Sequence, residues 1–108
     1  MMPFKLTETS PGKFSLLLTQ FSPADAIFDE AGHEGGGYGW ESVAVQVVAE
    51  TPGLADRLDF DPEGSMFCAH GTDRAALEQL GTELALLFND ATRLRALIAR
   101  VPEDAWDD

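Results

Sequence analysis

Gly35-Gly36-Gly37-Tyr38-Gly39-Trp40-Glu41 decides the fold, because a helix with an apolar stripe begins directly behind this glycine-rich stretch. Glycine has no Cβ and so permits a close approach, but ordering it costs more conformational entropy than ordering other residues. We therefore expect a turn or a surface at which something approaches this backbone closely. The spacing matches neither the dinucleotide-binding nor the P-loop pattern, and the preceding acids Asp29, Glu30 and Glu34 repel phosphate. No cofactor is expected here.

Helical patterns lie on both sides of the glycines. The following helix has an apolar stripe made by Trp40, Val43, Ala44, Val47 and Val48. Upstream, Ser22 as N-cap and Pro23 at the first helical position predict a short helix over 24–31. Downstream, Thr72 and Asp73 cap a long helix that Asn89-Asp90 ends, and a last helix stops at Pro102.

Four strands complete the pattern. Strands over 4–8 and 14–21 flank a tight turn at 10–13, and strands over 57–61 and 66–70 flank the turn Asp61-Pro62-Glu63-Gly64-Ser65. The order ββ(α)αββαα predicts an α+β fold, an antiparallel sheet of two hairpins with helices packed on one face. At 108 residues, the chain is expected to form a single domain over 1–108.

The charge is unusual. Nineteen acidic residues stand against seven basic ones, which gives a net charge of −12. Such a chain is not expected to bind nucleic acid or an anionic membrane, and its partners should be basic. Cys68 is the only cysteine, so no intrachain disulfide forms and a reducing cytoplasm fits. The N-terminus lacks a signal-peptide pattern, and no apolar run is long enough to span a membrane.

Few residues suggest chemistry. Cys68 and His70 share one face of a predicted strand, but with His33 they are too scattered for a metal site. Asp59 and Asp61 also point the same way, as a solvated strand face, for acid/base work or to bind a cation. An enzyme would need a deep pocket where Asp59, His70 and Cys68 converge. Trp40 starts the apolar stripe and is expected mainly in the core, with Tyr38 more exposed; Trp106 fits either setting.

Three segments carry a family resemblance: Gly37-Tyr38-Gly39-Trp40-Glu41-Ser42, the hairpin from Leu58 to Ala69, and Asp73-Arg74-Ala75-Ala76-Leu77. In combination they resemble the immunity protein 51 family of bacterial polymorphic toxin systems. The resemblance implies a cytoplasmic non-enzyme that binds a cognate toxin domain and neutralises it. It supplies no catalytic or metal residue to carry over.

The residues themselves agree with a stoichiometric inhibitor, because negative charge speeds the encounter with a basic partner such as a nuclease toxin. Our hypothesis is that the toxin-facing surface lies around the glycine loop and the second hairpin. It consists of Glu34, Tyr38, Trp40, Glu41, Asp59, Asp61 and Glu63. The alternatives are an acidic decoy that mimics nucleic acid and a small enzyme.

Overall fold

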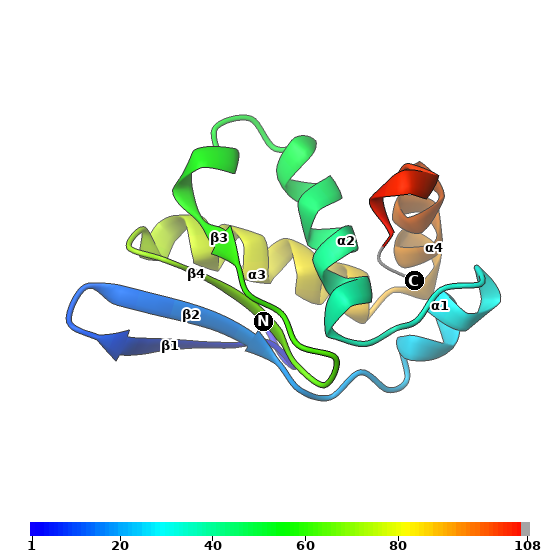
Figure 1. Cartoon of the computed structure of the whole chain (residues 1–108), viewed down its shortest axis with the longest axis horizontal. Helices are drawn as coiled ribbons and strands as arrows, with labels where there is room; N and C mark the ends of the chain where they lie inside the picture. The colour runs from blue at the N-terminus through cyan, green and yellow to red at the C-terminus, as the bar shows by residue number, and fades with distance from the viewer. Residues whose placement is uncertain (107–108) are drawn as a thin grey trace.

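The computed structural model describes residues 1–106 and has the expected α+β architecture (Figure 1). One antiparallel sheet holds four strands in the order β1-β2-β4-β3. The strands are β1 (Lys5–Ser10), β2 (Lys13–Leu18), β3 (Asp59–Phe60) and β4 (Phe67–Gly71). The two hairpins are joined through β2 and β4, so β1 and β3 form the edges of the sheet.

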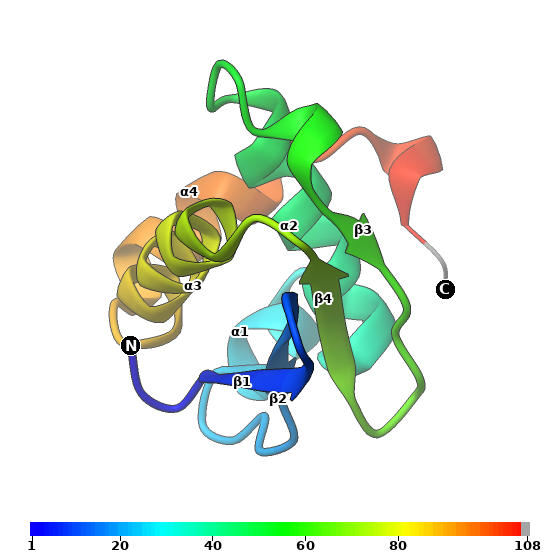
Figure 2. The same ribbon diagram turned by 90° about the vertical axis from the view of Figure 1, so that its left-hand side faces the viewer.

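The four α-helices are α1 (Asp25–Glu30), α2 (Gly37–Ala49), α3 (Arg74–Phe88) and α4 (Ala91–Arg100), and two 3₁₀ turns, η1 (Ala55–Arg57) and η2 (Glu103–Ala105), complete the fold. Helices α2 and α3 pack on one face of the sheet, while α4 packs against α1, α2 and α3 (Figure 2). The sheet side chains beneath the helices are almost completely buried: Leu16, Leu18, Phe67 and Ala69. The prediction of helices packed on one face is confirmed.

Helix α2 begins at Gly37, three residues before the predicted start, and its first turn lies against the turn between β3 and β4. The Gly37 N–H donates to the carbonyl oxygen of Gly64 at 3.2 Å. A Cβ on Gly37 would overlap the carbonyl oxygens of Glu63 and Met66, and one on Gly36 would lie 2.6 Å from the Gly64 oxygen. The close approach expected from the sequence is therefore made by the chain's own hairpin.

Trp40 occupies the centre of the core, with no exposed surface. Its ring lies 5.5 Å from that of Phe4, 5.4 Å from that of Phe28 and 5.7 Å from that of Phe88. The indole N–H has no hydrogen-bond partner among the described residues. A buried, unpaired donor costs about 1–3 kcal/mol, so the packing of these rings must more than offset it.

Some predicted boundaries were wrong. Ser22 does not cap α1, because the helix begins at Asp25 after Ala24, which makes no side-chain cap. Strand β2 ends at Leu18 rather than Phe21. Strand β3 has only two residues, since the segment before it forms η1. The cap at Asp73 is confirmed: its carboxylate accepts from the Ala76 N–H.

The contact between the glycines and the hairpin predicts that Gly37→Ala destabilises the fold by about 3 kcal/mol, because a backbone carbonyl cannot move as a flexible side chain can. Denaturant unfolding of the purified variant measures this. Gly64→Ala is the matched control from the opposite side of the same contact: nothing lies within 4 Å of its Cβ position. We expect the control to stay within about 0.5 kcal/mol of the parent. Equal stability of both variants would contradict this account of the contact.

Candidate functional site

The two segments that the sequence analysis selected are brought together by the contact between α2 and the hairpin. Tyr38 follows Gly37 in the first turn of α2 and is 46% exposed. From the contact, four exposed carboxylates follow the hairpin and β3 to their far end, and they are here called the acidic edge: Glu63 and Asp61 in the turn, Asp59 on β3, and Asp56 on η1. Glu34 and Glu41 flank the start of α2 from within its own segment.

Trp40 does not belong to this surface. It is completely buried among Phe4, Phe28 and Phe88 and presents no atom to a partner. The apolar stripe that begins at Trp40 already indicated a core position, and the structure confirms that interpretation. Trp40 is therefore not part of the proposed surface.

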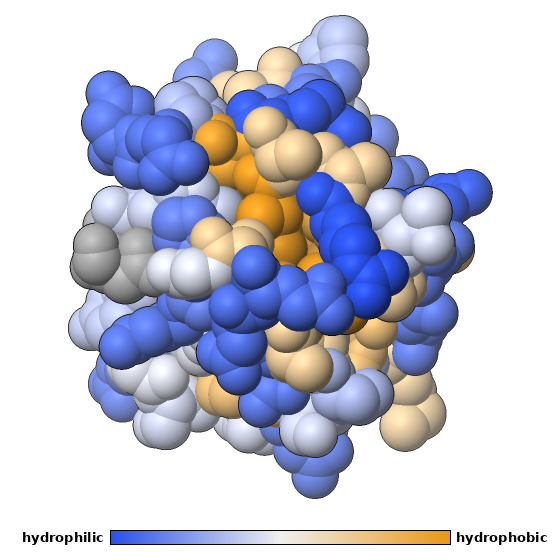
Figure 3. Space-filling model, turned by 90° about the vertical axis from the view of Figure 1, so that its right-hand side faces the viewer, coloured by the Kyte–Doolittle hydropathy of each residue, from blue (hydrophilic) through white to orange (hydrophobic). Residues whose placement is uncertain are grey.

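Every arginine of the chain forms an ion pair with a carboxylate outside the acidic edge. The pairs are Arg57–Asp73 (2.6 Å), Arg74–Glu78 (2.8 Å), Arg93–Asp90 (3.4 Å), Arg95–Glu30 (2.8 Å) and Arg100–Glu50 (2.7 Å). Two of them tie α4 to other helices, Arg95 to α1 and Arg100 to the end of α2. Figure 3 shows the end of the molecule where α1 and α4 lie, with apolar residues exposed in patches between hydrophilic ones.

Those pairs affect the titration of the acids that form them. Hydrogen bonds from Arg100 and Gln46 hold the pKa of Glu50 below its ordinary value, and the hydrogen bond from Arg95 does the same for the pKa of Glu30. By contrast, Asp59, Asp61 and Glu63 form no ion pair with any residue in 1–106. The carboxylates of Asp59, Asp61 and Glu63 are therefore not neutralised by an ion pair within the described chain.

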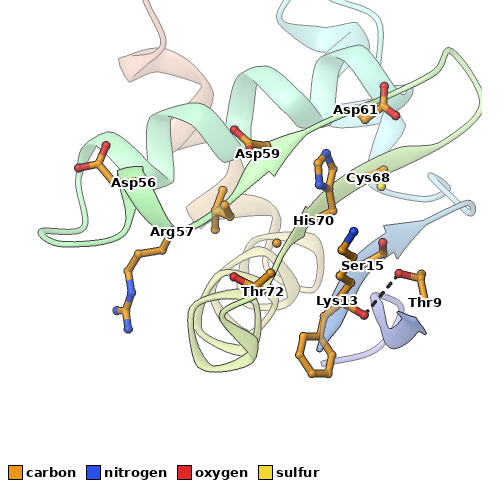
Figure 4. Close-up of a pocket in the computed structure, with 13 residues that line it drawn as sticks. Thr9, Lys13, Ser15, Asp56, Arg57, Asp59, Asp61, Cys68, His70 and Thr72 are labelled. Carbon is orange, nitrogen blue, oxygen red and sulfur yellow. Dashed lines mark hydrogen bonds between the residues drawn. The ribbon is translucent and has the colours of Figure 1, made fainter. Parts of the chain in front are cut away.

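A groove of about 580 Å³ runs beside the acidic edge on the outer face of the sheet, away from α2 and α3 (Figure 4). The strand register explains its lining. Ser15 on β2 pairs with His70 on β4, which pairs with Asp59 on β3. The next row holds Leu17 and Cys68, and the Asp61 N–H donates to the Cys68 carbonyl oxygen. Alternation along the strands thus turns these side chains outward while Leu16, Ala69 and Phe60 face the helices.

Asp59, His70 and Cys68 do converge at this groove, but the thiol is not set up as a nucleophile. Burial raises the pKa of the Cys68 thiol, and the charge of Asp61 raises it further, against a weaker effect of a hydrogen bond from Ser15. A nucleophilic cysteine needs the opposite shift, since the thiolate is the reactive form. Within residues 1–106, no three His, Cys, Asp or Glu side chains are grouped so that they could hold a metal ion.

Sequence reasoning missed the β1–β2 side of the groove. Thr9, Lys13 and Ser15 line it, although none of them stands out by residue type. The signal that could have found them is the strand alternation around Leu16 and Leu18, which places Ser15 on the face opposite the core. The pairing of β2 with β4 was still required, because it alone brings Ser15 beside His70.

Trp106, whose role was left open, is half-buried. Its ring stacks on that of His33 with centroids 3.9 Å apart and meets Phe28 edge-on at 6.2 Å. The Ser42 hydroxyl, on α2, donates to the carbonyl oxygen of Ala105 at 3.1 Å. The segment around η2 is thereby fixed across the start of α2, which makes Trp106 a packing residue in this structure.

A comparison with protein families matches residues 4–103 to the model described as Immunity protein 51. The match covers nearly the whole chain. No curated protein and no solved structure matches it. None of the helices in the described part of the chain is long and apolar enough to cross a membrane.

The environment of Cys68 predicts its reactivity. Because its pKa is raised, the midpoint of the pH dependence of alkylation by iodoacetamide should lie above that of an ordinary thiol. Asp61→Asn removes one cause and should lower the midpoint, although burial keeps it above the ordinary value. Asp29→Asn, a change on α1, is the control and should leave it unchanged. A midpoint below that of a free thiol would instead support a reactive cysteine and reopen the enzyme hypothesis.

Proposed function

The chain belongs to the immunity protein 51 family, and from this premise we propose that it neutralises a basic toxin domain by binding it stoichiometrically through an acidic surface. Membership in the family implies a toxin-neutralising role and a toxin as partner. The binding surface, the basic nature of the toxin and the absence of an enzymatic activity are our proposals. A cytoplasmic location is proposed with them, in keeping with the single cysteine.

The observation that carries the proposal is the unequal distribution of charge. The arginines are used in ion pairs with carboxylates elsewhere, and within residues 1–106 the carboxylates of the acidic edge form no ion pair. Such an edge attracts a basic partner over roughly a Debye length, about 8 Å at physiological ionic strength. Tyr38, which is 46% exposed and follows the Gly37 that lies against Glu63, adds an aromatic side chain of the kind that dominates binding energy in protein interfaces.

The proposed surface consists of Glu34, Tyr38, Glu41, Asp59, Asp61 and Glu63. Its acidic members would meet lysine and arginine side chains of the toxin. A nuclease is the toxin class that fits best, since proteins that bind the phosphate backbone carry basic surfaces. An inhibitor that covers such a surface blocks access of nucleic acid without any chemistry of its own.

The function is tested first by capture. Tagged protein is expressed in its own host, recovered at low and at high salt, and its partners are identified by mass spectrometry. We expect one toxin domain to co-purify in equimolar amount at both salt concentrations, because a specific interface adds packing to charge. Recovery of no toxin would contradict the proposal. A salt-sensitive group of unrelated basic proteins would instead favour the acidic decoy.

The surface is tested by charge reversal. Changing Asp59, Asp61 and Glu63 together to lysine should weaken binding of the captured toxin domain at least about tenfold and reduce the dependence of its association rate on salt. The control changes Glu78, Glu83 and Asp104 to lysine, which alters the net charge by the same amount away from the acidic edge. Circular dichroism checks that both variants are folded. Equal weakening by both sets would point to net charge rather than to this surface.

A further inference from the structure

The two walls of the groove on the outer face of the sheet differ in charge: one is acidic and the other carries hydroxyls and a lysine. One wall is the acidic edge, from which Asp59 and Asp61 reach the groove; the other is the β1–β2 hairpin, which contributes Thr9, Lys13 and Ser15. Figure 4 shows His70 between the two walls and Arg57 extending away from Asp59 and Asp61. Arg57 is held by Asp73 on the other side, so its charge does not neutralise the acidic wall.

The width of the groove follows from the sheet itself. Strands β3 and β2 flank β4 on either side, and neighbouring strands lie about 4.8 Å apart, so the backbones of β3 and β2 are about 10 Å apart and β1, which carries Thr9, lies one spacing further. One extended chain fits into that space. A helix, about 10–12 Å across with its side chains, is wider than the spacing between β3 and β2.

The negative charge of the acidic wall also acts on the floor of the groove. Cys68 lies there with 9% of its surface exposed, and after burial the charge of Asp61 is the next cause that raises the pKa of its thiol. A negative charge that disfavours a thiolate favours a cation at the same place. The floor is therefore a position at which an ammonium or guanidinium group gains from the surrounding charge.

We propose that this groove receives an extended basic segment of the partner protein, with a lysine or arginine side chain held between Asp59 and Asp61 above His70. This inference rests on the proposed function and names the part of the surface that makes the contact. The Thr9 hydroxyl donates to the Lys13 carbonyl oxygen and the Ser15 hydroxyl bonds to Cys68, so these oxygens would act as acceptors for backbone N–H groups of the segment. Lys13 is the one cation of the groove that opposes the inserted charge, because Arg57 is paired.

The groove is tested without any toxin by titrating the labelled protein with a short capped peptide of alternating serine and arginine, followed by NMR. Amide shifts should be concentrated at Ser15, Asp59, Asp61 and His70. Replacing Asp59 and Asp61 together by asparagine should weaken binding about fivefold, and Lys13→Gln should strengthen it about twofold. The matched control, Asp29→Asn with Glu103→Gln, should change nothing. Shifts spread over the whole acidic surface, or a weakening by Lys13→Gln, would overturn the proposal.

A second experiment measures binding of the captured toxin domain. Ser15→Trp fills the groove without altering charge and should weaken toxin binding at least tenfold, whereas Thr82→Trp on α3 should not. Thr9→Trp replaces Ser15→Trp if thermal unfolding shows that the latter misfolds. If the toxin binds the filled variants as well as the parent, the proposal that the groove receives the segment is contradicted and the proposed function stands. If the parent binds no toxin, the proposed function fails, and the peptide titration alone decides the groove.

Discussion

The structure depends on the contact between the first turn of α2 and the turn that joins β3 to β4. Gly36 and Gly37 allow backbone to meet backbone there, with the Gly37 N–H bonded to the Gly64 oxygen. This contact fixes the direction in which α2 leaves the sheet and so places Trp40, three residues later, among the rings of the core. The same contact brings the turn that carries Glu63 against Gly37, the residue before Tyr38. One close approach thereby determines both the core and the candidate site.

Local sequence signals predicted the helices and strands but not all of their boundaries. The Asp73 cap, the β1–β2 turn with Gly12 at positive φ, and the helical stripes are each set by neighbours in the sequence, and they were found. The start of α2 was wrong because glycine disfavours a helix interior. Gly37 is held there by the hairpin, more than twenty residues away, and Gly39 by its close approach to the Glu34 carbonyl oxygen. Strand β3 was overestimated because alternation does not distinguish it from the 3₁₀ turn that precedes it.

The candidate site was predicted in its charges and not in its shape. Acidic residues near the glycines are visible in the sequence, as is the exposure of Tyr38 relative to Trp40. Which carboxylates lack a cation is not visible, since Arg57 could have paired with Asp56, Asp59 or Asp61 and instead bonds to Asp73. The groove depends on the β2–β4 pairing, which brings Ser15 and His70 into one row from positions far apart in the chain.

The division of charge has a consequence for how such a protein achieves both speed and selectivity. Uncompensated carboxylates at one edge accelerate the approach of any basic partner, and this alone would produce a decoy. Selectivity requires a feature that penalises the wrong partner. The groove supplies one, because it admits an extended chain and its two carboxylates, Asp59 and Asp61, lie on one wall only. A basic protein that presents only a helix or a flat surface would be attracted by the carboxylates but would not enter the groove. The edge would then set the rate of encounter and the groove the rate of release.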